Sequence, residues 1–133
     1  MTYVIKIVIE GTPLSWKAPF VGSKGSFSPR YEAVQLFKQL IRQQYQGPVI
    51  ECAVICEMTF YMPIPRHFTK KKHRMIAESI LRPAGTPDRT NLAKLYEDCL
   101  QGIVIKNDSQ IVGGKVEKFY GEVPRAVIKI EAI

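Results

Sequence analysis

The segment that most constrains the fold is the run from residue 49 to residue 62, in which two kinds of position alternate. Side chains on a strand point alternately to its two faces, so this run has one continuous apolar face and one mixed face. The apolar face carries Ile50, Cys52, Val54, Cys56, Met58, Phe60 and Met62. Pro63 and Pro65 follow and end the pattern. The chain is therefore predicted to fold around a long strand with one buried face.

Shorter alternating runs predict three further strands, at residues 2–10, 111–120 and 125–132. Residues 11–30 follow the first of these, and their frequent Pro and Gly predict an irregular connection. Strands are thus expected near both ends of the chain, where they can pair with the long central strand.

Apolar residues spaced three and four positions apart predict two helices. The first is expected to start with Ser28 as N-cap and Pro29 at its first helical position, and to end near residues 46–48. The second is expected over residues 90–101. Its buried stripe consists of Leu92, Leu95, Tyr96 and Cys99. Residues 69–81 have a thin apolar stripe, which leaves open a short helix or a mobile arm.

The order strand, helix, long strand, basic connection, helix and two strands fits neither repeated parallel crossovers nor an all-strand domain. It predicts a single α+β domain over residues 1–133, with a mixed β-sheet and helices packed on one face. The apolar fraction of 46% and the charged fraction of 23% are ordinary for a soluble globular protein. Neither a run of about 18 apolar residues nor a secretory leader is found, so a cytoplasmic location without membrane contact is expected.

The three cysteines, Cys52, Cys56 and Cys99, are odd in number and lack the spacing of a zinc site. Cys52 and Cys56 lie in the long apolar run, and Cys99 lies on the apolar stripe of the second helix. All three are therefore predicted to be small buried hydrophobic residues in a reducing compartment.

Positive charge is concentrated in one segment. The chain has 19 basic and 12 acidic residues, a formal net charge of +7. Residues 66–82 contain one acid, Glu78, and the basic residues Arg66, Lys70, Lys71, Lys72, Arg74 and Arg82. So dense a patch is typical of proteins that bind a polyanion such as nucleic acid, whereas a solvated loop that only maintains solubility is the alternative. A weaker basic and aromatic patch covers residues 15–17 and 23–25.

Acidic residues follow the basic segment. Asp88 precedes the helix predicted at residues 90–101, Asp98 lies near its end, and Asp108 lies in the loop beyond it. Lys94 falls on the same side of that helix as Asp98, because residues four apart are neighbours. Carboxylates bind hard divalent cations, and such cations with a nearby lysine support phosphodiester hydrolysis. From the spacing alone, a helix cap, an exposed ion pair and a turn remain the alternative interpretation.

The same residues form a longer motif. The chain reads Pro87-Asp88-Arg89-Thr90-Asn91-Leu92-Ala93-Lys94, then Asp98, then Asn107-Asp108-Ser109-Gln110. It resembles the signature of the RusA-type Holliday-junction resolvases, which is roughly Pro-Asp-x-Asp-Asn-Leu-x-Lys, a later helix Asp, and Asp-Asp-Ser/Ala-Gln. Further similarities to that family are the turn at residues 11–17, Phe27-Ser28-Pro29, and Ile64-Pro65-Arg66 ahead of the lysines.

The resemblance implies a homodimeric α+β nuclease of phage or prophage origin that nicks four-way DNA junctions symmetrically. It implies Mg²⁺ as the cofactor, with Mn²⁺ as an alternative. Carried over by position, it makes Asp88 and Asp108 metal ligands, Asp98 a further acidic ligand, and Lys94 the catalytic lysine. Asn91 is expected to orient the motif.

The resemblance also assigns the basic residues to branched DNA. The predicted DNA surface consists of Lys17, Lys24, Arg30, Arg66, Lys70, Lys71, Lys72, Arg74 and Arg82. A two-fold dimer suits a four-way junction, because a junction of approximate two-fold symmetry then presents one strand to each of two equivalent sites.

Two positions depart from the signature. Thr90 stands where the family has its second Asp, and Asn107 stands where the closing pair has its first. Thr90 matters more, because a hydroxyl is a neutral and weaker ligand than a carboxylate. Three functions are weighed: a junction-resolving endonuclease, a branched-DNA-binding protein with weakened or lost cleavage, and a phage protein with a partner other than nucleic acid. The concentrated positive charge argues against the third.

Overall fold

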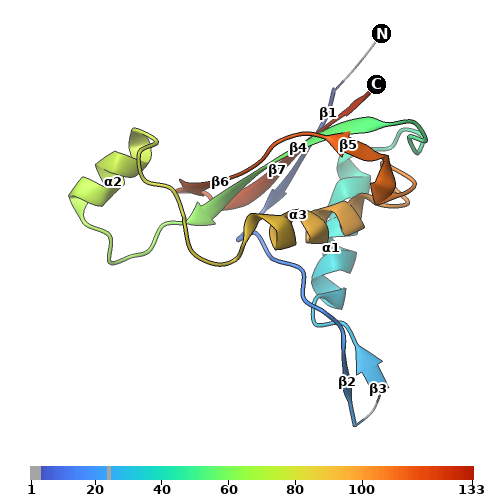
Figure 1. Ribbon diagram of the computed structural model, residues 1–133, viewed down its shortest axis with the longest axis horizontal. Helices are drawn as coiled ribbons and strands as arrows, with labels where there is room; N and C mark the ends of the chain where they lie inside the picture. Colours follow the sequence, from blue (N-terminus) through green and yellow to red (C-terminus); the bar gives the residue numbers. More distant parts are fainter. Residues whose placement is uncertain (1–3, 24) are drawn as a thin grey trace.

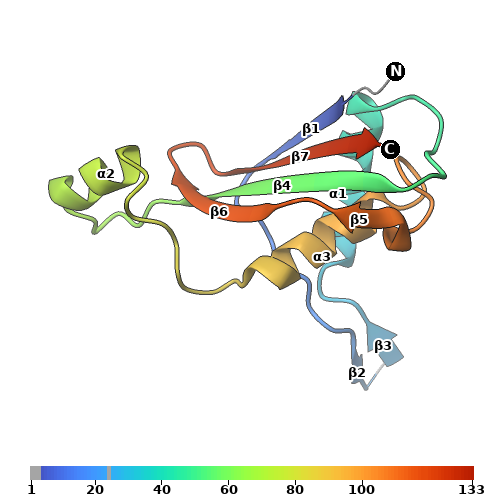
Figure 2. The same cartoon turned by 45° about the horizontal axis from the view of Figure 1, so that its top comes forward.

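The computed structural model describes residues 4–23 and 25–133. Within them, five strands form a mixed sheet in the order β1–β7–β4–β5, and β6 follows β5 along the same edge of β4 (Figures 1 and 2). The strands are β1 (Val4–Glu10), β4 (Val54–Pro63), β5 (Ile111–Gly113), β6 (Val116–Gly121) and β7 (Arg125–Ala132). β7 is antiparallel to β1 and β4, whereas β5 and β6 run parallel to β4.

Two helices, α1 (Tyr31–Gln44) and α3 (Arg89–Leu100), lie on one face of this sheet and contact one another (Figure 2). The predicted α+β fold with a mixed sheet is therefore confirmed. A third helix, α2 (Lys70–Ala77), stands apart at one end of the sheet and has no buried residue (Figure 1). The hairpin β2 (Phe20–Gly22) and β3 (Gly25–Phe27) projects near the start of α1. None of the helices described is long and apolar enough to cross a membrane.

The core forms where the apolar face of β4 meets the two helices. Val54, Cys56, Met58, Phe60 and Met62 are buried in alternation, as the sequence predicts. Tyr96 of α3 fills the space between the helices and the sheet, with its ring centroid 5.5 Å from that of Phe37 and 5.2 Å from that of Phe60. Its hydroxyl accepts the Leu14 backbone N–H at 3.1 Å, so this buried polar atom has a partner.

The start of the long strand differs from the prediction, because β4 begins at Val54 and not near residue 49. The backbone carbonyls of Ile50 and Cys52 accept hydrogen bonds from the side-chain amide of Gln110 instead of pairing in the sheet. Cys52 is consequently exposed, so the prediction of three buried cysteines was wrong for this one. Burial raises the pKa values of the Cys56 and Cys99 thiols to about 12, and these two are buried as predicted.

The first helix also begins later than predicted. Its N-cap is Arg30, without a side-chain cap, and Ser28 instead offers its backbone carbonyl to the Tyr31 N–H at 3.2 Å. The chain turns at Ser28 as it leaves the hairpin formed by β2 and β3. This hairpin replaces part of the irregular connection expected over residues 11–30. The helix ends at Gln44, two residues before the predicted end.

The strand predicted at residues 111–120 is divided into β5 and β6 at Gly114 and Lys115. Gly114 has φ +126°, and a Cβ atom there would lie 1.9 Å from the Cys56 carbonyl oxygen. Only glycine therefore allows the chain to pass so close to β4. The break matters for the site, because Gly114 and Lys115 line a cavity against α3.

Candidate active site along helix α3

The N-terminal end of α3 is held by hydrogen bonds. Asp88 is the N-cap, and its Oδ1 atom accepts the Asn91 backbone N–H at 3.1 Å. The Asn91 carbonyl in turn accepts the Trp16 N–H at 2.9 Å, which ties the segment after β1 to the helix. Lys118 of β6 donates from Nζ to the carbonyls of Gly85 and Pro87, at 2.7 and 2.8 Å. Asp88 therefore acts as a helix cap, and the loop that precedes it is hydrogen-bonded to the sheet through Lys118.

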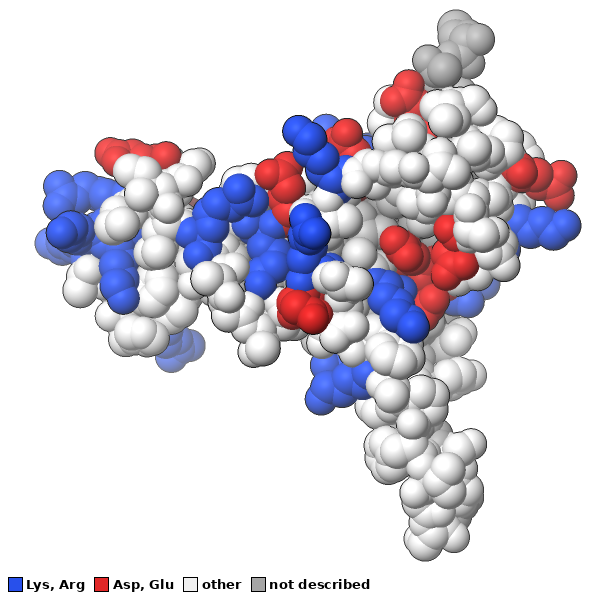
Figure 3. Space-filling view, in the orientation of Figure 1, with Lys and Arg blue, Asp and Glu red and all other residues white. Residues whose placement is uncertain are grey.

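The C-terminal half of α3 is different, since carboxylates gather there. Burial, and after it the charges of Asp108 and Asp98, raise the pKa of Glu97. Burial raises the pKa of Asp98 as well, with Lys94 opposing the shift and Asp108 adding to it. Figure 3 shows acidic side chains grouped over the part of the molecule where α3 ends, with basic ones beside them. These carboxylates lie near enough to repel one another.

Asp108 is placed by a tight turn, η1 (Asp108–Gln110), that is anchored to the segment just before β4. Asn107 caps this turn, its Oδ1 atom accepting the Ser109 N–H at 2.9 Å. Gln110 accepts the Asn107 N–H at 2.8 Å and donates to the carbonyls of Ile50 and Cys52. Asn and Asp cap about equally well, so Asn107 preserves the turn that presents Asp108.

Lys94 places its charge beside this acidic end. Its Nζ atom lies 4.0 Å from the centroid of the Trp16 ring, a cation–π contact. Its charge lowers the pKa values of both Glu97 and Asp98 against the effect of burial. The side chain is exposed, so its ammonium group is accessible to a ligand on the surface.

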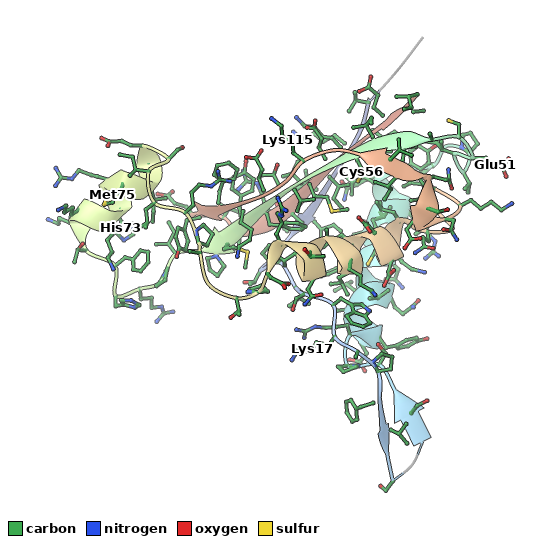
Figure 4. All side chains as sticks on the ribbon, viewed as in Figure 1. Lys17, Glu51, Cys56, His73, Met75 and Lys115 are labelled. Carbon is green, nitrogen blue, oxygen red and sulfur yellow. The ribbon has the colours of Figure 1, made fainter. Side chains whose placement is uncertain are left out.

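An open cavity of about 640 Å³ lies between α3 and the connection from β5 to β6. It is lined by Arg89, Thr90, Ala93, Glu97, Gly114, Lys115, Val116 and Glu117. Figure 4 labels Lys115 on the strand side and Cys56 on β4 close by. The cavity therefore runs along the side of α3 that carries Thr90, and it ends at the acidic cluster.

The structure brings together three of the four predicted catalytic residues: Lys94, Asp98 and Asp108. It does not bring Asp88 to them. Ten residues separate Asp88 from Asp98, about 15 Å along a helix axis, and Asp88 is not among the charges that act on Asp98 or Glu97. Among the residues described, no three His, Cys, Asp or Glu side chains converge closely enough to form a complete metal cage.

The donor set nevertheless fits a hard divalent cation. Mg²⁺ usually keeps several waters and is bound through one or two carboxylates together with substrate phosphates. Asp108 and Asp98 can supply these carboxylates. The pKa of Asp98 is raised first by burial and then by the charge of Asp108, and a bound cation would offset both effects.

Comparison with known proteins identifies the family of the chain. The family model for endodeoxyribonuclease RusA matches residues 17–131, which include α3, η1 and the whole cavity. The chain belongs to the RusA endodeoxyribonuclease family. This is a family of metal-dependent nucleases that act on branched DNA junctions, so the resemblance seen in the motif is confirmed. The chain is also 32% identical over 137 residues to the uncharacterized protein YqaN of Bacillus subtilis (strain 168), covering 97% of this chain and 96% of that protein.

For a RusA nuclease, the position of the basic residues relative to the acidic end is important. α2 carries exposed Lys70, Lys71, Lys72 and Arg74, with exposed Arg66 in the segment before it. This arm is attached to the sheet through Phe68, whose ring lies against Tyr120 at 5.5 Å and under Lys72 Nζ at 4.7 Å. Figure 3 shows that basic side chains are spread over the surface from α2 to the acidic cluster.

The remaining basic residues of the predicted DNA surface differ in how far other residues hold their side chains. The guanidinium of Arg82 lies 3.9 Å from the Phe119 ring centroid, and its Nε donates to the Lys118 carbonyl at 2.9 Å. Arg30 donates to the Ser15 carbonyl at 3.0 Å. Both are thus held by other residues, which leaves fewer free donors for phosphate. Lys17 is exposed below α3 (Figure 4), and Lys24 lies outside the described residues.

Sequence reasoning gave no role to four charged residues that line the cavity: Arg89, Glu97, Lys115 and Glu117. Glu97 could have been found, because it follows Thr90 by seven residues, about two helical turns, and so lies on the same face. No comparable signal marks Lys115, since its place depends on how β5 and β6 pair with β4.

Proposed function

We propose that this chain is a divalent-metal-dependent crossover junction endonuclease, which binds four-way DNA junctions and resolves them by paired symmetric nicks. The observation that carries the proposal is the convergence of Lys94, Asp98 and Asp108 at one end of α3, next to a basic surface. Membership in the RusA family supports nuclease chemistry on branched DNA. Mg²⁺ is proposed as the metal, with Mn²⁺ as an alternative.

Asp108 and Asp98 would hold the metal, and the DNA phosphate would complete its coordination. When bound, a divalent cation polarises the phosphate and lowers the pKa of a coordinated water. Lys94 would offset the negative charge that develops on the phosphate oxygens, and its ammonium group lies over the Trp16 ring. Asp88 is proposed as a further required acid, which approaches the DNA from the other end of the helix.

The exposed basic residues of α2, together with Arg66, would contact the phosphate backbone away from the cleaved bond. Binding of this kind releases counterions and is therefore strongly dependent on salt. A homodimer is proposed because two equivalent sites related by two-fold symmetry can cut two strands of a junction in register.

A second candidate is a protein of the same fold that binds branched DNA and cleaves it weakly or not at all. Thr90 favours it, because the side chain lines the cavity with a neutral hydroxyl where the RusA signature has an aspartate.

A cleavage assay distinguishes the two candidates. A synthetic mobile four-way junction and a linear duplex of the same sequence are incubated with wild-type protein or Asp108→Asn, in Mg²⁺ or Mn²⁺. Symmetric paired nicks on the junction alone, absent with the variant, are expected for the endonuclease. Tight junction binding without nicks in either metal would favour the second candidate.

A further inference from the structure

We propose that Arg89 binds a DNA phosphate at the centre of a groove that leads one strand of the junction from Asp88 to the acidic end of α3. The inference deepens the proposed function and rests on it for DNA as the partner. Arg89 lies outside the predicted DNA surface, and it occupies a variable position of the RusA-type signature.

The groove consists of three open cavities that share Arg89. The first is the cavity of about 640 Å³ between α3 and the connection from β5 to β6. The second, of about 330 Å³, shares Arg89, Val116 and Glu117 with the first and is also lined by Arg82. The third, of about 440 Å³, is lined by Arg89, Lys118 and the loop before α3. The three cavities therefore adjoin one another around the Arg89 side chain.

This groove connects the two ends of the candidate active site. Asp88 lines the third cavity, and Glu97, beside the acidic cluster, lines the first. Exposed Lys115 lines the same cavity as Glu97 and supplies positive charge there. The separation of about 15 Å between Asp88 and Asp98 corresponds to about four nucleotides of one DNA strand. A single strand in the groove would therefore pass both ends of α3.

The groove also opens toward the basic arm. Arg82, which lines the second cavity, follows α2 in the chain. Figure 1 shows α2 beyond the end of β6, and Tyr120 of β6 contacts Phe68, which attaches the arm. DNA held by the exposed lysines of α2 would thus lie next to the entrance of the groove.

Arg89 offers free hydrogen-bond donors in this groove, whereas two neighbouring cations are already occupied. Arg82 pairs with Glu117 at 3.5 Å, and Lys118 Nζ donates to two backbone carbonyls. Arg89 is exposed and, within residues 4–23 and 25–133, forms no salt bridge. One of its guanidinium nitrogens donates to the Val116 carbonyl at 3.5 Å. A guanidinium has five N–H donors in a planar fork that matches phosphate, so most of them remain available.

The test measures binding to a synthetic four-way junction by fluorescence anisotropy, without metal and over a series of salt concentrations. Arg89→Gln is compared with Lys129→Gln, which makes the same change of charge. Lys129 is exposed on β7 and points away from the helices, since Ile128 and Ile130 on either side are buried.

Arg89→Gln should weaken junction binding about tenfold and reduce the slope of log K against log salt by about 0.9, the value for one phosphate contact. Lys129→Gln should change binding less than about twofold, because it removes only a distant, screened charge. Equal effects of the two variants would overturn the proposal, since total charge would then account for both.

Photo-crosslinking gives a second measurement, which does not depend on the Arg89 variants. The amino acid p-benzoylphenylalanine replaces either Ala84, which is exposed in the third cavity, or Lys129. Irradiation of the junction complex should crosslink DNA to residue 84 and not to residue 129. Absence of a crosslink at residue 84 in a protein that binds the junction would place the DNA elsewhere and overturn the proposal.

These experiments separate the groove from the proposed nuclease activity. A wild-type protein that binds junctions and never cuts them would contradict the activity, while a loss of binding confined to Arg89→Gln would still support the groove. A wild-type protein that binds no DNA at low salt would overturn both proposals.

Discussion

The two ends of α3 contain the same residue types and use them in different ways. At the N-terminal end, the Asp88 carboxylate accepts a backbone N–H, and the preceding loop is fastened by Lys118. At the other end, burial and the mutual repulsion of Glu97, Asp98 and Asp108 raise the pKa values of Glu97 and Asp98. The acid at one end satisfies a backbone N–H, whereas the acids at the other end are partly buried and close to one another.

This difference indicates which acids are explained by folding. A cap accounts for Asp88 without any ligand, whereas no capping role accounts for the grouping of Glu97, Asp98 and Asp108. Strained or destabilised groups concentrate at functional sites, because binding a ligand offsets their instability. The C-terminal end of α3 is therefore the better place to look for metal chemistry.

The largest effect is expected from Asp108→Asn, which removes the carboxylate on η1 and keeps the fold of the turn. Loss of one metal ligand should reduce junction cleavage at least about 100-fold, since metal stabilisation is worth several kcal/mol. Junction binding should stay the same or tighten, because a negative charge near phosphate is removed. Single-turnover cleavage and gel-shift binding measure the two quantities, and loss of both together would mean that Asp108 holds the fold.

Two variants separate the two proposed roles of Asp88, which are to cap α3 and to supply a required negative charge. Asp88→Asn retains a good cap and should keep the thermal stability, while reducing cleavage at least about tenfold if the charge is required. Asp88→Ala loses the cap as well and should lower the free energy of unfolding by about 1 kcal/mol. Thermal melts and cleavage rates of both variants are the measurement. Full activity in Asp88→Asn would show that Asp88 only caps the helix and that its charge is not needed for cleavage.

Substitutions in α2 test whether DNA binding can be separated from the functions of both ends of α3. Replacing Lys70, Lys71 and Lys72 by Ala should weaken junction binding. It should also reduce the slope of log K against log salt by about 0.9 for each DNA phosphate that the arm no longer neutralises. The cleavage rate of fully bound junction should stay near that of the wild type. An unchanged slope would remove α2 from the DNA surface.

The smallest effect concerns stability and pH. Since the folded-state pKa of Glu97 is raised, the folded protein holds its proton more tightly than the unfolded chain does. Stability is therefore lost as pH rises from the ordinary glutamate pKa of 4.5 through the raised pKa of the folded state. Without metal, Glu97→Gln should be more stable than wild type at pH 7 in a thermal melt, and this advantage should shrink toward pH 4.

Glu117→Gln is the matched control for that melt, because the Glu117 carboxylate pairs with Arg82 at 3.5 Å. It should be neutral or slightly destabilising at pH 7. A gain in stability from Glu117→Gln equal to that from Glu97→Gln would contradict the contrast between the acids of this cavity.

Much of the site could be predicted because its residues are close in sequence. Lys94 and Asp98 are one helical turn apart, and the apolar spacing of the segment predicts that helix. The turn residues Asn107 and Asp108 follow from local chemistry too. By contrast, the sequence did not reveal that Asp88 stands apart from the other acids, nor that Cys52 is exposed, since both depend on hydrogen bonds between distant segments.

The sequence by itself determined the α+β class, the buried face of the long strand and the motif that identifies a RusA nuclease, because local periodicity and short spacings specify these. Only the tertiary structure decided how the two ends of α3 differ. Gln110 reaches across 60 residues to Ile50, and Lys118 reaches across 31 to Pro87, and these contacts place Asp108 beside Glu97 and leave Asp88 as a cap. Repulsion between carboxylates depends on distance in space, which no spacing along the chain specifies.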